Sequence, residues 1–261
     1  MPGMQPPTLT EVLRAHRLLA GHLPPTPMWS YPALNQVAGA TVYLKHENYQ
    51  PVGAFKVRGG LNLLARPPDR ERSRGVVTYS TSTGNHTQSI AYAAPSCGTD
   101  CRAVMPRGAN QVKGRAVQAL GAAVVPHGAD LATAQAHAEQ LAGDTGARLV
   151  SPGDEPALVA GVGTLYLEAF EAVPDLDAVV VPVGSGTGAA AACLVAGAVA
   201  SGCRIVAVQS SAAPAPRDSW RCGACVQRPD RTGVEGLATG RGVRAAAAAA
   251  PHRPGRLPPC V

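Results

Sequence analysis

The chain reads Val-Val-Val-Pro-Val-Gly-Ser-Gly-Thr-Gly at residues 179–188 and continues into an alanine-rich segment of helical length. This order predicts a buried β-strand, a tight turn and the N-terminus of a helix. Backbone N–H groups and the helix dipole favour an anion at such a turn, and Ser185 and Thr187 add hydroxyl donors. Taken alone, the motif fits an ordinary tight turn between a strand and a helix equally well.

Two familiar phosphate-binding patterns do not match this turn. No Gly-Lys-Ser/Thr follows the glycines, so the turn is not a P-loop. A dinucleotide-binding fold would place an acidic residue near the end of the next strand, where this chain has Gln209. The turn therefore predicts either an anion site of another kind or a plain connection.

Short apolar runs rich in β-branched residues alternate with alanine-rich segments as far as Val208. Strands that alternate with helices predict a parallel sheet covered on both faces, and hence an α/β fold. The predicted strands are Thr41–Leu44, Val76–Tyr79, Arg102–Met105, Ala122–Val125, Arg148–Val150, Ala178–Val183 and Arg204–Val208. The predicted helices are Gln111–Leu120, Leu131–Ala142, Val162–Ala172 and Gly188–Ala200.

The bulk composition indicates a soluble cytoplasmic protein. The 261 residues suffice for one large domain or two modest ones. The N-terminus lacks a basic stretch followed by an apolar run, so no signal peptide is predicted, and no apolar run is long enough to span a membrane. The seven cysteines are an odd number and are predicted to be reduced. A single Cys-x-x-Cys pair, Cys222 and Cys225, has no second pair, so no metal site is predicted.

The positive net charge does not indicate a nucleic-acid partner. The formal charge is +6, but residues 212–261 contain eight arginines and three acids and so carry +5 of it. A nucleic-acid surface is expected to cluster its charge on a folded face with a recognisable reading motif. Here the charge lies in a Pro/Arg/Ala-rich tail, and the predicted ligand is a small molecule.

Lys56 is one of only three lysines in the chain, with Lys45 and Lys113. Small residues and glycines surround it in Gly-Ala-Phe-Lys-Val-Arg-Gly-Gly, residues 53–60, and they allow a bulky ligand to approach the backbone. A lysine is the usual residue for a Schiff base with an aldehyde, because its amine can lose its proton when it is desolvated. The segment therefore predicts a covalent attachment point.

A third segment, Ser-Thr-Ser-Thr-Gly-Asn-His-Thr-Gln at residues 80–88, follows a predicted strand and opens a helix. Ser, Thr and Asn at a helix start are common N-caps. One cap needs only one such residue, and this stretch has several. Exposed backbone donors at a helix N-terminus would also suit a substrate carboxylate.

Taken together and in this order, the three segments resemble the fold-type-II pyridoxal-phosphate enzymes, and specifically the threonine/serine dehydratase family. Lys45–Gly59 resembles the family's Schiff-base segment, Ser82–Gln88 its substrate and cofactor-ring loop, and Gly184–Gly188 its phosphate loop. The resemblance runs from about Leu9 to about Arg241. The amino-acid sequences of the first two segments are also similar to those of hydroxyectoine-utilisation dehydratases.

This resemblance implies a tryptophan-synthase-β-like architecture with two parallel-sheet domains. Residues 1–76 and 152–241 would form the large cofactor-binding domain, and residues 77–151 a small domain inserted into it. The cofactor, pyridoxal 5'-phosphate, would lie in the cleft between them. The substrate would be a small hydroxy amino acid, which loses its β-hydroxyl and amino groups to give a keto acid and ammonia. A racemase of the same fold and an inactive remnant are the alternatives, and an intact enzyme of this kind would be a homo-oligomer.

The resemblance also implies a role for each matching residue. Lys56 would hold the cofactor and then remove the α-proton of the substrate. Thr83 occupies the position of a serine that serves the opposite face in racemising relatives, so it is a second catalytic candidate. The cofactor would be bound by Phe55, Lys56, Asn85, Gly184, Ser185, Gly186, Thr187 and Gly188. The substrate carboxylate would be bound by Ser82, Thr83, Gly84 and His86.

Two features depart from the family pattern. Thr87 stands where the family usually has glycine or alanine, and its side chain could narrow the site. The match fades after Arg241, and residues 242–261 are rich in Ala, Arg and Pro without periodicity. We interpret this tail as the trace of a truncation or frameshift, which predicts a disordered end and a large domain that is incomplete at its C-terminus.

Overall fold

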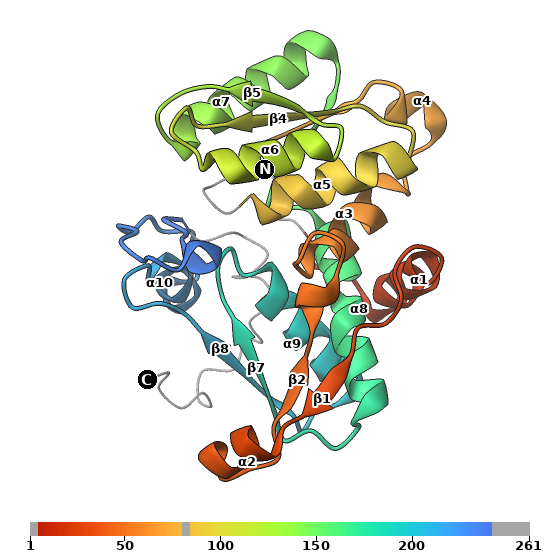
Figure 1. Cartoon of the computed structure of the whole chain (residues 1–261), viewed down its shortest axis with the longest axis vertical. Coiled ribbons are helices and arrows are strands. Elements are labelled where there is room, and N and C mark those ends of the chain that lie inside the picture. The colour runs from red at the N-terminus through yellow and green to blue at the C-terminus, as the bar shows by residue number, and fades with distance from the viewer. Residues whose placement is uncertain (1–4, 80–83, 242–261) are drawn as a thin grey trace.

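The computed structural model describes residues 5–79 and 84–241. Its elements follow the predicted alternation of strands and helices (Figure 1). The strands are β1 (Met28–Ser30), β2 (Tyr43–Lys45), β3 (Val76–Tyr79), β4 (Cys101–Met105), β5 (Ala123–Pro126), β6 (Arg148–Val150), β7 (Ala178–Pro182) and β8 (Arg204–Val208). The α-helices are α1 (Leu9–Leu19), α2 (Pro32–Ala38), α3 (Lys56–Leu64), α4 (Asp69–Arg72), α5 (Asn85–Ser96), α6 (Gln111–Ala119), α7 (Leu131–Thr145), α8 (Pro156–Ala172), α9 (Thr187–Val199) and α10 (Ala215–Cys222). Two 3-10 helices are η1 (Glu47–Tyr49) and η2 (Glu235–Leu237).

One parallel sheet has the strand order β5-β4-β3-β6 and occupies the upper part of the molecule in Figure 1. Successive side chains of a strand point to opposite faces, so one face of β3 packs under α5 and the other under α7. Val76 belongs to the core cluster that includes Ile90 of α5, whereas Val77 belongs to the cluster that includes Ala134 and Ala138 of α7. The sheet is thus covered on both faces, as the alternation predicts.

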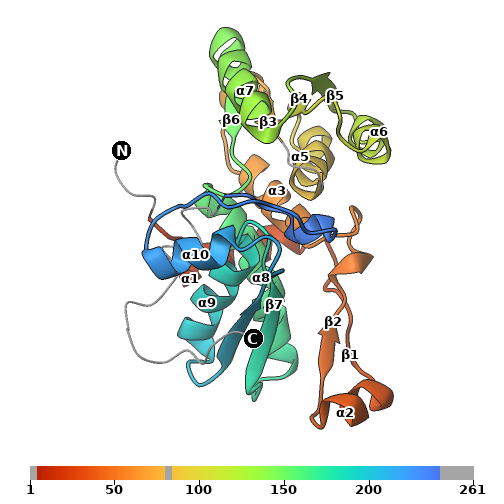
Figure 2. The same ribbon diagram turned by 90° about the vertical axis from the view of Figure 1, so that its left-hand side faces the viewer.

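The lower part of the molecule is built around α8 and α9. The parallel strands β7 and β8 form a second sheet, and α8 packs against α1, α3 and α9 (Figure 2). A third pair, β1 and β2, is antiparallel. The fold is therefore the predicted α/β class with more than one parallel sheet.

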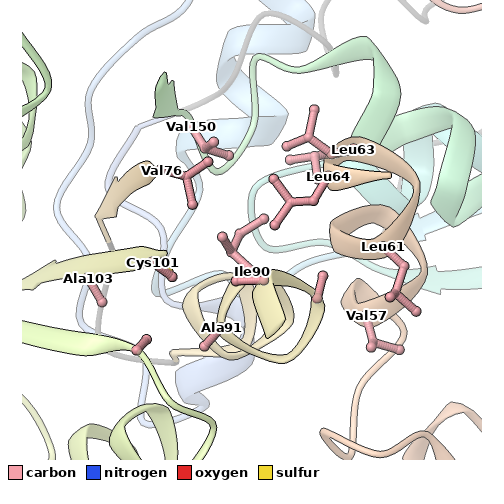
Figure 3. Close-up of a cluster of buried hydrophobic side chains, with 14 of the residues drawn as sticks. Val57, Leu61, Leu63, Leu64, Val76, Ile90, Ala91, Cys101, Ala103 and Val150 are labelled. Carbon is pink, nitrogen blue, oxygen red and sulfur yellow. The ribbon is translucent and has the colours of Figure 1, made fainter. Parts of the chain in front are cut away.

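Helix α3 joins the two parts of the molecule. Its side chains Val57, Leu61 and Leu64 are buried in the same cluster as Ile90 of α5 and Val150 of β6 (Figure 3). Lys56 is the first residue of this helix, so a buried apolar stripe fixes the position of the lysine. Among the described residues, none of the helices combines the length and the apolar character that a membrane span requires.

Glycines allow α3 to lie unusually close to its neighbours. A Cβ atom at Gly60 would collide with the carbonyl oxygen of Ser89 in α5, and one at Gly161 in α8 would collide with the carbonyl oxygen of Arg58. A Cβ at Gly59 would lie 2.9 Å from the carbonyl oxygen of Leu158. These contacts involve backbone atoms, which cannot rotate away as a side chain can.

We therefore expect Gly60→Ala to lower the free energy of unfolding by about 1–3 kcal/mol, the usual cost of overpacking. Gly143→Ala in α7 is the matched control, because nothing lies within 4 Å of its Cβ position. Alanine is the better helix former, so the control should gain up to about 1 kcal/mol. Urea unfolding followed by circular dichroism measures both. Equal effects of the two substitutions would contradict the close approach of α3 and α5.

All seven predicted strands are present, with ends that are unchanged or shifted by one or two residues. An unpredicted strand and a shifted helix start are the differences, and both have physical reasons. Strand β1 has only three residues and gives no readable period, and α8 begins at Pro156 rather than Val162 because proline is well suited to the first turn of a helix. The domain boundaries stay a prediction, and the predicted disordered tail, residues 242–261, lies outside the described residues.

Candidate active site

Lys56 lies at the start of α3, directly after the turn that contains Gly53. Part of its side chain is exposed, yet enough protein surrounds the amine for desolvation to lower the pKa of Lys56 to about 8. Burial is the single cause of this shift, and among the described residues no carboxylate forms an ion pair with Lys56. An amine in this setting can lose its proton near neutral pH and act as a nucleophile or a base.

The glycine-rich turn lies beside this lysine. Lys56 Nζ donates a hydrogen bond to Ser185 Oγ at 3.3 Å, and Ser185 Oγ lies 3.2 Å from Thr187 Oγ1. Thr187 is the first residue of α9, and Gly186 has the positive φ of 95° that the turn into this helix requires. A Cβ at Gly184 would lie 2.5 Å from the carbonyl oxygen of Gly236. The turn thus presents two hydroxyls and the N-terminus of a helix to the lysine.

The start of α5 supplies a third predicted residue. His86 is 5% exposed, and its Nε2 lies 2.9 Å from Thr78 Oγ1. The Thr78 hydroxyl donates to the carbonyl oxygen of Val150 at 3.0 Å, so His86 Nε2 carries the hydrogen in their contact. Burial, followed by the nearby charge of Lys56, lowers the pKa of His86 to about 3. The imidazole is therefore neutral at physiological pH.

One small cavity collects residues from these three segments. Its lining is Lys56, Gly59, His86, Leu158, Val162 and Thr187. The structure thus brings the predicted lysine, the predicted histidine and the predicted turn together from positions far apart in the sequence.

The remaining predicted residues do not line this cavity, and two of them lie outside the described residues. The ring of Phe55 has its centroid 5.9 Å from Lys56 Nζ, and its Cζ would lie 3.5 Å from a Cβ at Gly188. Gly84 has a φ of 64° and precedes Asn85, the first residue of α5, which is not among the residues that line the cavity. Ser82 and Thr83 lie outside the described residues, so their roles stay predictions.

A buried network of ion pairs links α3, the helix that begins at Lys56, to α8. Arg58 is 1% exposed and bonds Glu47 through Nε and Nη2, both at 2.8 Å. The same guanidinium donates hydrogen bonds to Glu168 of α8 at 2.5 and 2.9 Å. Lys45 Nζ donates a further hydrogen bond to Glu168 at 2.5 Å. The network thus contains two cations, Arg58 and Lys45, and two anions, Glu47 and Glu168. Glu47, Lys45 and Arg58 all lie in the predicted Schiff-base segment, whereas no local pattern in the sequence indicates that Glu168 joins them.

Charge balance keeps this network ionised. Burial alone would raise the pKa of the Glu168 carboxyl, but hydrogen bonds and charge from Arg58 and then Lys45 hold that pKa below its usual value. Burial opposes the charge on Arg58 in the same way, and the hydrogen bonds that Arg58 donates to Glu47 and Glu168 raise its pKa. Because Arg58 is only two residues beyond Lys56, the network anchors the first turn of α3 to α8.

Thr87, the residue that departs from the family pattern, is fully buried in the first turn of α5. Its hydroxyl is the one buried side-chain oxygen of the described chain that has no hydrogen-bond partner. An unpaired buried hydroxyl costs stability because it has lost its water without gaining a partner.

Replacing Thr87 by valine removes the hydroxyl while keeping the shape of the side chain. We expect a gain of about 1–3 kcal/mol in the free energy of unfolding, since the desolvation cost disappears. Thr78→Val is the contrasting variant, because the Thr78 hydroxyl bonds both His86 and Val150 and its removal should destabilise the protein. Thermal and urea unfolding measure both. A loss of stability in Thr87→Val would show that this hydroxyl has a partner in solution.

Comparison with known proteins places the chain among characterised enzymes. A family described as "Pyridoxal-phosphate dependent enzyme" matches residues 19–253. The L-threo-3-hydroxyaspartate ammonia-lyase of Saccharomyces cerevisiae is 36% identical over 84% of this chain and 67% of its own length. The beta-hydroxyaspartate dehydratase of Paracoccus denitrificans is 34% identical over 83% of this chain and 68% of its own length. The chain thus spans about two thirds of the length of these two relatives.

A solved structure is similar over most of the fold. The serine racemase of Dictyostelium discoideum superposes with a TM-score of 0.84 at 32% identity. The match covers 91% of this chain and 76% of the racemase chain. Relatives with two different named activities, elimination and racemisation, therefore share this fold.

Proposed function

The chain belongs to the family of pyridoxal-phosphate-dependent enzymes, and on that premise we propose that it is an ammonia-lyase of the threonine/serine dehydratase type. It would convert a small hydroxy amino acid into a keto acid and ammonia. One observation carries the proposal: Lys56 Nζ lies 3.3 Å from Ser185 Oγ on the glycine-rich turn. This contact joins an amine that can react with an aldehyde to a turn that can bind a phosphate.

Pyridoxal phosphate carries both an aldehyde and a phosphate, and the residues present suit both groups. Lys56 would hold the group covalently through Nζ. The Ser185 and Thr187 hydroxyls and the N-terminus of α9 would bind the phosphate. Glycine at position 188 keeps the second residue of α9 free of a side chain next to Phe55, whose ring would pack against the cofactor. Phe55 and the α9 turn thus flank the lysine.

When bound, pyridoxal phosphate supplies an electron sink for the electron pair that remains when the α-proton departs. The substrate amine would first displace Lys56 from the cofactor. The freed Nζ would then accept the α-proton, and it must be neutral to do so. Its lowered pKa of about 8 supports this role, because a lysine with the usual value of about 10.4 would be almost fully protonated at neutral pH.

His86 is the second titratable group beside the cavity. With a pKa of about 3 it is neutral at physiological pH, so burial alone lowers the pKa of Lys56. Its ring lines the same cavity and is fixed by the hydrogen bond to Thr78. We propose that His86 and Gly84, with Ser82 and Thr83, line the substrate carboxylate site, and that Asn85 hydrogen-bonds the cofactor ring hydroxyl.

The substrate class is tested by incubating purified protein and pyridoxal phosphate with serine, threonine and threo-3-hydroxyaspartate. The two hydroxyaspartate-acting relatives make the dicarboxylic amino acid a necessary member of this panel. We expect keto acid and ammonia in equal amounts from at least one substrate. Absence of both products from every substrate would contradict the proposed elimination.

A racemase is the second candidate, because the solved serine racemase superposes on most of this chain. Chiral chromatography of the recovered amino acid separates the two activities. A racemase yields the opposite enantiomer without ammonia, whereas an ammonia-lyase releases ammonia and leaves the remaining substrate in its original configuration. We further propose that the protein works as a homo-oligomer.

A further inference from the structure

Lys113 lies beside the start of α5, where we have placed the substrate carboxylate. It belongs to α6, the helix that packs next to α5 (Figure 2). A Cβ atom at Gly84, the residue directly before α5, would lie 3.4 Å from Lys113 Cβ and 3.6 Å from Lys113 Cδ. The stem of the Lys113 side chain therefore lies against the face of Gly84 that has no side chain, and the amine follows just beyond Cδ.

Glycine at position 84 permits this approach. Gly84 is buried, and its φ of 64° is a backbone conformation that other residues rarely adopt. The Cβ position of Gly84 is also 3.4 Å from Nε2 of Gln88, which lies one turn further along in α5. The side chains of Lys113 and Gln88 are both half-buried. A lysine and an amide thus flank the start of α5, and both can donate hydrogen bonds to a ligand.

The charges around the cavity suit a ligand with more than one anionic group. Among the described residues that line the cavity, none is acidic, and the histidine is neutral at physiological pH. Lys56 supplies one amine, and Lys113 brings a second one to the start of α5. Surrounding protein partly desolvates this second amine, which lowers the pKa of Lys113. An anion close to the amine would favour its charged form and so oppose that shift.

A hydroxy amino acid in this site would place its α-carboxylate on the backbone N–H groups at the start of α5. Serine and threonine have no other anionic group, whereas a dicarboxylic hydroxy amino acid has a second carboxylate on its β-carbon. We propose that Lys113, assisted by Gln88, binds this second carboxylate and so selects a dicarboxylic substrate such as threo-3-hydroxyaspartate over serine and threonine. The inference rests on the proposed elimination and on the proposed place of the α-carboxylate. Lys113 determines specificity in this scheme and transfers no proton.

The ratio of kcat/KM for threo-3-hydroxyaspartate to kcat/KM for serine tests this selection. In the wild-type protein the ratio should be at least about 10, because a site built to bind a polar group rejects the analogue that lacks it. Lys113→Met keeps the stem of the side chain but removes the charge. It should lower the ratio by about 10–100-fold, the effect of losing one hydrogen bond between charged groups. Lys113→Arg, which keeps the charge, should retain most of the preference.

The chain offers a matched control on the same helix. Arg115 lies two residues beyond Lys113 in α6 and is exposed, so Arg115→Met removes a positive charge without touching Gly84. This control should leave the ratio unchanged. An unchanged ratio in Lys113→Met would overturn the proposal. An equal loss for both substrates would overturn it as well, because Lys113 would then bind the α-carboxylate or support the fold.

A binding measurement separates this inference from the proposed function. L-Aspartate has the second carboxylate and L-alanine lacks it, and neither has a β-hydroxyl to eliminate. Calorimetric titration of the protein loaded with pyridoxal phosphate should show that aspartate binds at least about tenfold more tightly than alanine, and that Lys113→Met loses this preference. The preference without elimination of any hydroxy amino acid would support the role of Lys113 and contradict the proposed function. Elimination without the preference would contradict the role of Lys113 alone.

Discussion

Lys56→Ala is expected to abolish elimination, with a fall in the rate of at least about 10²–10⁴-fold, the range for loss of a positioned general base. The same change removes the covalent attachment of the cofactor, so bound pyridoxal phosphate should wash out during gel filtration. Lys56→Arg is the informative companion, because it keeps length and charge but its guanidinium does not lose a proton. Both variants should be inactive and folded. Appreciable activity in either would show that another group accepts the proton.

The direction in which the wild-type rate changes with pH tests the same role of Lys56. A lysine accepts a proton only in its neutral form, and the pKa of Lys56 is lowered to about 8 by burial. Activity limited by this group should therefore rise as the pH rises through about 8 and fall below it. His86, with a pKa of about 3, contributes no change in this window. A rate that decreases between pH 7 and pH 9 would contradict the assignment.

The second large effect is expected for the buried network. Arg58→Met leaves Glu47 and Glu168 facing each other without the guanidinium that bonds both. Removing one partner of a buried ion pair typically costs about 3–5 kcal/mol, and we expect a loss of this size in the free energy of unfolding. Arg66→Met is the control, because Arg66 and its partner Glu11 are about one third exposed and 3.8 Å apart. That exposed pair should contribute less than about 1 kcal/mol.

The network also predicts that the stability of the wild-type protein and that of Arg58→Met depend on pH in opposite directions. In wild type the folded-state pKa of Glu168 is lowered, so its contribution to stability is present above the unfolded pKa and is lost as the pH falls. In Arg58→Met, burial of Glu168 with fewer partners should raise its pKa above the unfolded value, so acidification should recover stability in the variant. Urea unfolding between pH 4 and pH 7 measures both slopes. Parallel slopes would mean that Arg58 does not control the ionisation of Glu168.

The parts of the fold that the sequence could predict depend on local signals. The run from β7 through the glycine turn into α9 has a strand of β-branched residues, a required positive φ at Gly186 and a helix-forming segment in immediate succession. The expectation of a buried strand is wrong for most of β7, where only Val181 is buried and Val180 is 66% exposed. Each signal lies within a few residues of the next, so local propensity and tertiary structure agree. For the same reason Lys56 could be singled out, since its glycine-rich surroundings are adjacent in the chain.

The parts that could not be predicted depend on distant contacts. Glu168 is 110 residues from Arg58, and nothing near either residue reveals that they meet. Helix α3 was not predicted, because two glycines weaken its helical signal, although those glycines are what permit its close approach to α5 and α8. The cytoplasmic location and the roles of Ser82 and Thr83 stay predictions.

The most direct test of the proposed role of Lys56 is to identify the residue that holds the cofactor. Purified protein is incubated with pyridoxal phosphate, reduced with borohydride and digested with trypsin. We predict a phosphopyridoxyl group on Lys56, found by mass spectrometry in a peptide from His46 to Arg58 that trypsin has not cut after Lys56. A label on Lys45 or Lys113, or no label at all, would contradict the role that we propose for Lys56.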